Sequence, residues 1–594
     1  MKDPFEILEQ HILKSGGLDN FKKHDSVYIE GTFEIEGSGL SGSYKEWKKY
    51  TPGRFYNKID VDLGVFREMT GYTGNSIWKQ DNHRKVTNIT TDKLLSEYRI
   101  KGLMEKYEFA NPDSEYFKVS LGNEDDHYLL TIHNSLNEDV IKYYINRSTL
   151  LLDKKIYIKI DDTEITTFND YRLVNNIMLP FELKIENPDS DEKQDISILS
   201  YDFGHLSESV FDIPEEDSKD FEFLKGSKAE NISFEFLGGH IYLNASVNGK
   251  KGKFVLDCGA EKSLLDNQFC KSLGLEQKGS MKGHGGSSDS ADFSFAVCKN
   301  ISVDDITLHN QTLLTFDLAK MFKVSTGLEI SGLLGFDLLS RFITKIDFAG
   351  QLISFYDPKD FKYTGIGSII KFELEGNILR IPLTVDKQYS GLFRVDTGAK
   401  DISFHYPFAK ENDFDKKEGF VGNVRGVGGL TKIKIVRFNE IAIGGFTIDN
   451  PLISFPIESQ SKSAFSIKSI IGNLGTDIMR HFIIFFDYKN NQLILEKGEN
   501  FNKSFPENHS GVQLNLNDTD EVFVKFISPE SPAEKSGLMQ DDSVLKINGK
   551  SVLEFSNLIE LKNCFNHPPY SDIILTVKRD NKTHEIKMKL EKLI

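Results

Sequence analysis

The chain has little of several features that would place a protein in a special class. It carries 4 cysteines in 594 residues, too few for a disulfide framework and without zinc-site spacing. No apolar run reaches about 18 residues, so no transmembrane helix is expected. The 72 Lys and Arg are outnumbered by 89 Asp and Glu, and a net charge of −17 argues against nucleic acid or anionic membrane as partner. The first residues also lack the basic start and apolar core of a signal peptide.

What remains is typical of globular domains. Hydrophobic residues make up 39% and charged residues 27% of the chain. At roughly 150 residues per domain the length predicts about four units, and alternating apolar and polar positions predict a mostly β protein. The expected domains are a curved antiparallel β domain, two related lobes and a small C-terminal module, at residues 1–211, 230–360, 361–498 and 508–594. Residues 212–229 and 499–510 are polar and are interpreted as linkers.

The N-terminal domain is expected to be a half-barrel covered by a helix. A short helix should end at Gly16-Gly17, alternation runs from about Ser26 to Phe203, and a helix is expected near Thr91 to Met104. With the segments 50–54 and 75–78, these features resemble the LolA-like lipoprotein-carrier family of bacterial envelopes. The resemblance implies a trough for an apolar ligand; a structural or docking role is the alternative.

A repeat crosses the middle of the chain. The segment FVLDCGA at 254–260 returns as FRVDTGA at 393–399. Three more pairs follow in the same order, at 283–286 and 426–429, 332–337 and 472–477, and 346–348 and 486–488. The offsets are 139, 143, 140 and 140 residues, which indicates a duplicated domain. Two copies related by a pseudo-two-fold axis would bring Asp257 and Asp396 together.

Two adjacent carboxylates can hydrolyse a peptide bond. At about 3 Å they cannot both ionise, so they share one proton. The ionised group then takes a proton from a bridging water, and its protonated partner polarises the scissile carbonyl. We therefore expect Asp257 and Asp396 to form the catalytic dyad, with a water as nucleophile and no metal or cofactor.

The neighbours of each aspartate suit this role. Gly259 and Gly398 allow close backbone approach, and Thr397 offers a hydroxyl to the opposite lobe, whereas Cys258 offers only a thiol, which is a weaker donor. Two glycine-rich segments should form hairpin tips that grip an extended peptide main chain. These flap residues are Gly283, His284, Gly285 and Gly286 in the first copy, and Gly426, Val427, Gly428 and Gly429 in the second.

Residues 232–498 resemble a tandem, single-chain form of the retropepsin-like aspartic proteases, with lobes too short for full pepsin lobes. The resemblance implies a bilobal β fold, a catalytic pair at Asp257 and Asp396, and an extended peptide substrate. Cys258 and Asn473 depart from the repeat, which predicts tuned or impaired activity rather than its loss. Asp337 and Asp477 are expected to be structural and to bond the helix that follows each of them.

The C-terminal 84 residues resemble a bacterial PDZ domain. The match is carried by Gly511-Val512-Gln513-Leu514, a strand at 522–527, a short helix at 531–537 and an Asn548-Gly549 hairpin. Asp541 stands where the family usually has glycine. The resemblance implies that Gly511, Val512, Gln513 and Leu514 receive a C-terminal or extended peptide.

Three functions follow from these patterns. The first is an aspartic endopeptidase whose PDZ domain recruits or gates substrates. The second is an impaired pseudo-protease that only binds peptides, and the third is an envelope scaffold or carrier. Two lobes in one chain favour a monomer, and the family resemblances imply the periplasm or cell envelope.

Overall fold

The computed structural model describes residues 3–216, 220–283, 285, 290–427, 429–459 and 463–594. Within them the chain is mostly β, as predicted, and divides into two compact units. Unit 1 comprises Met1–Asp220 with Lys278–Lys282, and unit 2 comprises Phe221–Gln277 with Gly283–Ile594. The expected fold class is confirmed.

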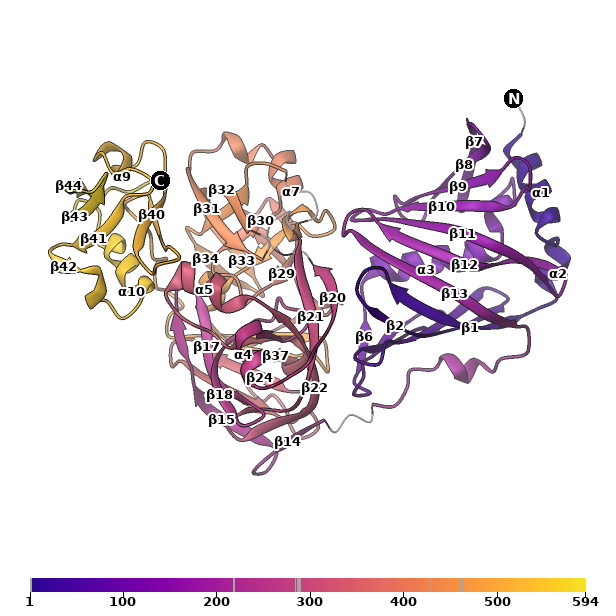
Figure 1. Ribbon diagram of the computed structural model, residues 1–594, viewed down its shortest axis with the longest axis horizontal. Coiled ribbons are helices and arrows are strands. Elements are labelled where there is room, and N and C mark those ends of the chain that lie inside the picture. Colours follow the sequence, from indigo (N-terminus) through magenta and orange to yellow (C-terminus); the bar gives the residue numbers. More distant parts are fainter. Residues whose placement is uncertain (1–2, 217–219, 284, 286–289, 428, 460–462) are drawn as a thin grey trace. The chain divides into compact units, whose positions relative to one another are not determined.

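Unit 1 is one curved sheet of 13 antiparallel strands (indigo to purple in Figure 1) in the order β6-β5-β4-β3-β2-β1-β13-β12-β11-β10-β9-β8-β7. Its strands are β1 (Ser26–Ile35), β2 (Leu40–Thr51), β3 (Arg54–Asp62), β4 (Arg67–Tyr72), β5 (Ile77–Gln80), β6 (Val86–Ile89), β7 (Phe117–Glu124), β8 (His127–Asn134), β9 (Val140–Asn146), β10 (Leu152–Ile158), β11 (Thr163–Val174), β12 (Ile177–Asn187) and β13 (Glu192–Asp202). Its helices are α1 (Pro4–Lys14), α2 (Leu18–Lys22), α3 (Asp92–Glu105), η1 (Glu108–Ala110) and η2 (Glu208–Phe211).

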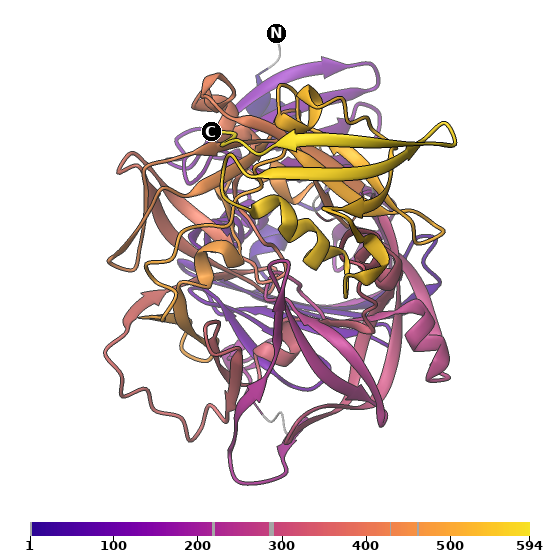
Figure 2. The same cartoon turned by 90° about the vertical axis from the view of Figure 1, so that its left-hand side faces the viewer.

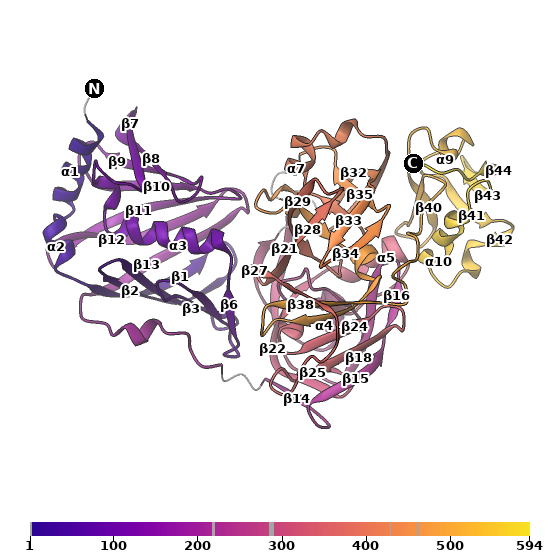
Figure 3. The ribbon, with the colours of Figure 1, turned by 180° about the vertical axis from the view of Figure 1, so that it is seen from behind.

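Both helices expected from the sequence are present. The side chain of Asp3 caps α1, and Gly16 and Gly17 follow its end with positive φ, as the stop signal predicts. Helix α3 lies across one face of the sheet, as Figure 3 shows, with Ile100 packed in the apolar cluster beneath it.

The first expected linker is partly wrong. Strand β14 (Phe221–Phe223) pairs with β22, and β15 (Lys228–Ser233) pairs with β25. Phe221 and Phe223 both pack edge-on against Phe342 of the first lobe. These short edge strands are held by their partners, which local alternation does not reveal.

The first lobe is a nine-stranded sheet with the two parallel pairings β18–β23 and β19–β22. Its further elements are β16 (Glu235–Leu237), β17 (His240–Val247), β18 (Lys250–Leu256), β19 (Leu264–Asp266), α4 (Asn267–Ser272), β20 (Gln277–Gly283), β21 (Ala291–Val303), β22 (Ile306–Phe316), α5 (Leu318–Thr326), β23 (Gly332–Leu334), α6 (Phe336–Leu339), β24 (Ile343–Asp347) and β25 (Leu352–Tyr356).

The second lobe repeats this plan with a ten-stranded sheet and the parallel pairings β29–β36 and β30–β35. Its elements are β26 (Ser368–Lys371), β27 (Glu373–Glu375), β28 (Ile378–Val385), β29 (Tyr389–Val395), β30 (Ile402–Phe404), α7 (Tyr406–Glu411), η3 (Phe414–Lys416), β31 (Phe420–Gly426), β32 (Gly429–Arg437), β33 (Glu440–Ile443), β34 (Phe446–Asp449), β35 (Leu452–Pro456), η4 (Ala464–Ser466), β36 (Gly472–Leu474), α8 (Thr476–Met479), β37 (Phe482–Asp487) and β38 (Gln492–Lys497).

A six-stranded sheet, β15-β25-β24-β37-β38-β26, joins the lobes. At its centre β24 pairs with β37, with Ile343 opposite Asp487 and Asp347 opposite Ile483. Lys345 pairs with Phe485, which is the equivalent residue 140 positions later in the second copy. On either side of this pair the strands run in opposite directions, so a two-fold rotation about it would exchange the two copies. The duplication read from the sequence is thus a pseudo-two-fold in the structure, and one continuous apolar core spans both lobes.

The C-terminal module, yellow in Figure 2, is a separate small sheet with its own core. Its elements are β39 (Val512–Leu516), β40 (Val522–Ile527), α9 (Pro532–Lys535), β41 (Ser543–Ile547), β42 (Lys550–Ser551), η5 (Val552–Glu554), α10 (Leu558–Lys562), η6 (Asn563–Asn566), β43 (Asp572–Arg579) and β44 (Lys582–Lys589). Ser531 caps α9, and Asn548-Gly549 forms the predicted hairpin turn. Asp541 has φ 67°, a conformation that glycine adopts more readily.

Candidate active site

The two aspartates sit at equivalent strand ends. Asp257 follows β18 and its N–H donates to the carbonyl of Leu334 at 2.9 Å, while Asp396 follows β29 and donates to Leu474 at 3.0 Å. In each lobe the accepting strand is the parallel neighbour, β23 or β36. Both aspartates are therefore fixed by the sheet rather than by a mobile loop.

The structure brings the two carboxyl groups close together, with the carboxyl of each aspartate lying against the glycine of the opposite loop. Each also accepts its own loop's N–H, from Gly259 at 2.8 Å and from Gly398 at 2.9 Å. A β-carbon at Gly259 or Gly398 would lie within 3 Å of the opposite carboxyl, so glycine is required at both positions. Burial, the charge of Asp396 and the hydrogen bond between them raise the pKa of Asp257 well above its ordinary value.

Four hydrogen bonds across the pseudo-two-fold axis connect the loop that carries Asp257 to the loop that carries Asp396, here called the dyad loops. The Thr397 hydroxyl accepts from the Cys258 N–H at 2.9 Å and donates to the carbonyl of Leu256 at 3.0 Å. The Cys258 sulfur accepts from the Thr397 N–H and donates to the carbonyl of Val395, both at 3.3 Å. The thiol therefore occupies the hydroxyl's place with the same pattern of bonds.

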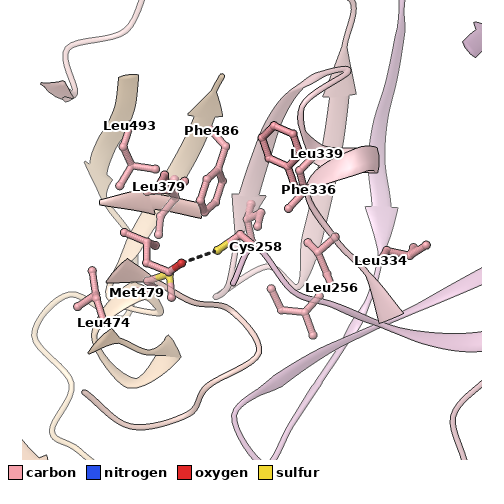
Figure 4. Packing of buried hydrophobic residues seen from close by; sticks show 14 of the residues in the cluster. Leu256, Cys258, Leu334, Phe336, Leu339, Leu379, Leu474, Met479, Phe486 and Leu493 are labelled. Carbon is pink, nitrogen blue, oxygen red and sulfur yellow. Dashed lines mark hydrogen bonds between the residues drawn. The ribbon is translucent and has the colours of Figure 1, made fainter. Parts of the chain in front are cut away.

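Cys258 is fully buried, and Figure 4 shows its hydrogen bond among apolar side chains of both lobes. Burial first, and then the charge of Asp396, raise the pKa of the thiol far above its ordinary value. A protonated, buried thiol is a poor nucleophile and a poor target for oxidants. These observations support a passive structural role. Cys270 and Cys298 are also buried free thiols, and Cys564 is half-buried.

Cys258→Thr is accordingly expected to leave cleavage equal or higher and to raise stability slightly. The hydroxyl is a stronger donor than the thiol, and one improved hydrogen bond contributes about 0.5–1.5 kcal/mol. Thermal unfolding and peptide cleavage measure the two effects. Loss of cleavage in a folded Cys258→Thr protein, or peroxide inhibition that the variant escapes, would contradict the passive role.

The lobes differ in one polar pair beside the dyad. Arg394 and Asn473 lie opposite each other on β29 and β36, where the first lobe has Val255 and Leu333. The Arg394 Nε donates to the Asn473 side-chain oxygen at 2.8 Å, and the Asn473 amide donates to Asp396 Oδ2 at 3.2 Å. Asp396 therefore has a side-chain donor from its own lobe.

Asp337 and Asp477 brace the dyad loops rather than the helices that follow them, which corrects the expectation from the sequence. The Asp337 carboxylate accepts from both the N–H and the hydroxyl of Ser263, at 2.8 and 2.6 Å. Asp477 accepts from Lys400 at 3.0 Å. Both aspartates lie within the short helices α6 and α8.

The glycine-rich segments come together at the tips. In the second lobe β31 and β32 form a hairpin closed by the pair Gly426 and Gly429. In the first lobe β20 ends at Gly283, and a β-carbon on Gly285 would lie 2.6 Å from Cβ of Val427. Gly285 and Val427 are therefore in contact. The predicted flap residues His284, Gly286 and Gly428 lie outside the described residues.

The PDZ residues named from the sequence are already engaged. Asn508 Oδ1 accepts the N–H groups of Ser510 at 2.8 Å and Gly511 at 3.1 Å, and the Val512 N–H donates to the Ser510 hydroxyl at 3.1 Å. The nest of N–H groups expected to receive a carboxylate thus holds a side-chain oxygen of the same module. Leu514 is fully buried in the module's core.

The module also contacts both lobes. The Gln513 amide exchanges two hydrogen bonds with the backbone of Asn423 on the flap strand β31, at 2.9 and 3.2 Å. The Ser528 hydroxyl donates to Val421 of the same strand at 2.6 Å. On the first lobe, Lys562 of α10 donates to the carbonyl of Ser325 in α5 at 2.6 Å, and burial lowers the pKa of this lysine to about 8.

Three residues contribute to the site in ways that the sequence did not predict. Asn473 was expected only to be a departure from the repeat, and no role was expected for Arg394 or Asn508. The signal for the first two was available, because both are polar at positions where the first copy has apolar residues. Among the described residues, no group of three or more His, Cys, Asp or Glu could hold a metal ion, and none of their helices combines the length and apolarity needed to cross a membrane.

Comparison with known proteins agrees with this geometry. A family model described as aspartyl protease matches twice, at residues 243–338 and 381–477, once in each lobe. A second model, described as PDZ domain, matches residues 510–590. The chain is therefore protease-like and carries a PDZ domain.

One curated relative is a probable periplasmic serine protease, Do/HhoA-like, from Haemophilus influenzae, 28% identical over 157 residues. The match covers 26% of this chain and 30% of the relative's length. Among solved structures, a DUF1329 family protein from Desulfovibrio piger is 16% identical with a TM-score of 0.27, covering 36% of this chain and 98% of that one. A putative outer membrane lipoprotein-sorting protein domain from Vibrio parahaemolyticus is 11% identical with a TM-score of 0.25, covering 35% and 95%.

Proposed function

We propose that the chain is an aspartic endopeptidase that hydrolyses peptide bonds with water activated between Asp257 and Asp396. The observation that carries the proposal is the close approach of two carboxyl groups supplied by equivalent loops of a duplicated domain, each lying against the glycine of the opposite loop. A cleft that only bound peptides would gain nothing from two carboxyl groups whose simultaneous ionisation is unfavourable. The completed set of bonds through Cys258 supports activity over the impaired alternative.

In the proposed reaction a peptide lies extended beneath the two flaps, whose backbone groups bind its main chain. One carboxylate removes a proton from the water as the oxygen attacks the scissile carbonyl. The other carboxyl donates its proton toward the carbonyl oxygen, giving a tetrahedral intermediate. A proton then passes from the dyad to the leaving nitrogen and the C–N bond breaks. As the new carboxyl group forms, one hydroxyl proton of the intermediate returns to the dyad, which again holds one proton.

The test is cleavage of a peptide library by the full chain across pH 3–8. Pepstatin, which presents a hydroxyl to a carboxyl pair, is expected to stop cleavage, and a reagent for catalytic serines is expected to have no effect. The serine reagent is included because the curated relative is named as a serine protease. Cleavage stopped by the serine reagent and untouched by pepstatin would overturn the aspartic mechanism.

We propose that the PDZ domain captures a peptide C-terminus or an extended segment, and that capture influences the flap. Strand β39 forms the end of its sheet, and its Gln513 holds the flap strand β31 through Asn423. A peptide added along β39 would compete with these bonds. Its binding would therefore change the position of the flap and affect the cleft.

The module should bind peptides with free C-termini more tightly than their amidated versions. Asn508→Ala is expected to increase that affinity about tenfold, since it frees two N–H groups for the carboxylate at about 1 kcal/mol or more. Fluorescence titration of the full chain with matched free and amidated peptides measures both effects. Equal affinities across a diverse panel would leave the module as an internal-segment binder or spacer.

We further propose that the protein is a monomer in the periplasm or cell envelope; the curated relative is named as periplasmic. Light scattering and cell fractionation test these two points. The carrier alternative concerns unit 1 alone, whose sheet would need to bind an apolar ligand.

A further inference from the structure

The asymmetry between the lobes concerns the proton of the dyad. In the first lobe the neighbours Val255 and Leu333 offer no side-chain donor, whereas in the second Asn473 donates to Asp396 Oδ2. Asn473 is buried, with 2% of its surface exposed, so its hydrogen bond does not compete with bulk water. Such a donor stabilises a carboxylate more than a carboxylic acid.

The orientation of Asn473 is set by Arg394. A guanidinium has donors and no acceptor, so the atom of Asn473 that contacts Arg394 Nε at 2.8 Å must be the amide oxygen. The amide nitrogen then points to the carboxyl of Asp396. Arg394 thus fixes which end of the amide faces the dyad, and its positive charge also acts on Asp257, where it opposes the raised pKa without reversing it.

We infer that Arg394 and Asn473 are positioning residues that keep Asp396 ionised and place the shared proton on Asp257, so that Asp396 is the base and Asp257 the acid in the attack on the peptide. The inference rests on the proposed function for its catalytic meaning, but the location of the proton is a property of the resting protein. The raised pKa of Asp257 agrees with it.

The other charged groups near the pair do not reverse this assignment. His240 of β17 is close enough to Asp396 to feel its charge, and burial lowers the pKa of this imidazole, which favours its neutral form. Lys400 bonds to Asp401 and Asp477, at 2.8 and 3.0 Å, and is engaged by these two carboxylates. Arg394 is therefore the cation that acts on the dyad through Asn473.

The test measures the pKa of the one carboxyl that each single variant retains. Asp257→Asn leaves Asp396 with its donor, and Asp396→Asn leaves Asp257 without one. Infrared difference titration of each variant against the double Asn variant reports the carboxylic acid band of the remaining group. We expect the pKa of Asp396 to lie one to two units below that of Asp257, the size of a charge-assisted hydrogen bond.

Adding Arg394→Val and Asn473→Leu to Asp257→Asn recreates the first lobe's apolar pair and should abolish most of this difference. Leu333→Ile, at the equivalent position of the first lobe, is the matched control and should change neither value. Equal pKa values in the two single variants, or a higher value for Asp396, would overturn the inference. Because this measurement needs no substrate, its outcome is independent of whether the protein cleaves peptides.

In the active protein, Asn473→Leu is expected to move the acid limb of the pH–rate profile upward by about one unit and to leave the alkaline limb in place. The Asn473 donor favours the singly ionised dyad over the neutral one. Its removal therefore raises only the pKa of the dyad's first ionisation. An unchanged acid limb in a folded variant that still cleaves would contradict the role of Asn473 while leaving the aspartic mechanism standing.

Discussion

Asp257→Asn and Asp396→Asn are each expected to lower peptide cleavage on the order of 10⁴-fold, because either change removes both the acid and the base function of a pair that acts as one unit. An Asn side chain keeps the size of Asp but cannot exchange a proton. Cleavage of a defined peptide by the purified variants measures the loss. A variant that retains a tenth of the activity would show that the reacting groups lie elsewhere.

Stability is the control for this experiment, and its sign follows from the pKa of Asp257. A carboxyl whose pKa is raised in the folded state lowers the free energy of unfolding as pH rises above the unfolded value, about 3.9, toward the folded value. Asp257→Asn removes this cost, so at neutral pH the variant should unfold at the same temperature as the natural protein or higher. The stability difference should disappear below about pH 3.5. A variant that is inactive because it is unfolded would fail this control.

The second large effect is expected for Thr397→Val, which removes the hydroxyl at nearly constant volume. The buried N–H of Cys258 loses its acceptor and the carbonyl of Leu256 loses its donor. Two buried backbone groups left without partners cost about 2–5 kcal/mol. In calorimetry, the midpoint temperature for unfolding of the two lobes should fall by roughly 5–15 °C.

Thr397→Ser is the matched control, since it keeps the hydroxyl and removes only a methyl group. It should lower the transition by far less than Thr397→Val and should retain cleavage. If both variants lose the same stability, the methyl packing of Thr397 and not its hydrogen bonds would hold the loops together.

The repeat allowed most of the site to be predicted. Nearly equal offsets between four pairs of segments indicated two copies, and two copies of an Asp loop imply that Asp257 and Asp396 meet. The structure agrees, because Ile343 pairs with Asp487 and Asp347 pairs with Ile483. This pairing relates the two copies by a pseudo-two-fold axis. Short local signals were also sufficient for α1, α3, α9 and the Asn548-Gly549 turn.

Long-range contacts account for what the sequence did not reveal. Phe221 and Phe223 lie in a stretch without periodicity, and they form a strand only because β22 and Phe342 receive them. The bonds of Asp337 and Asp477 to the dyad loops depend on a chain reversal that no local pattern encodes. The same is true of Asn508, whose role depends on N–H groups that are oriented by the turn at Gly511.

The most direct test of the dyad is a crystal structure of the full chain bound to a peptide in which the scissile bond is replaced by a hydroxyl-bearing, non-cleavable group. We expect the hydroxyl to lie within hydrogen-bond distance of both Asp257 and Asp396, with the peptide extended beneath Gly285 and Val427. A peptide bound elsewhere, or a hydroxyl that touches neither carboxyl in a closed site, would contradict the claim that these two aspartates carry out the hydrolysis.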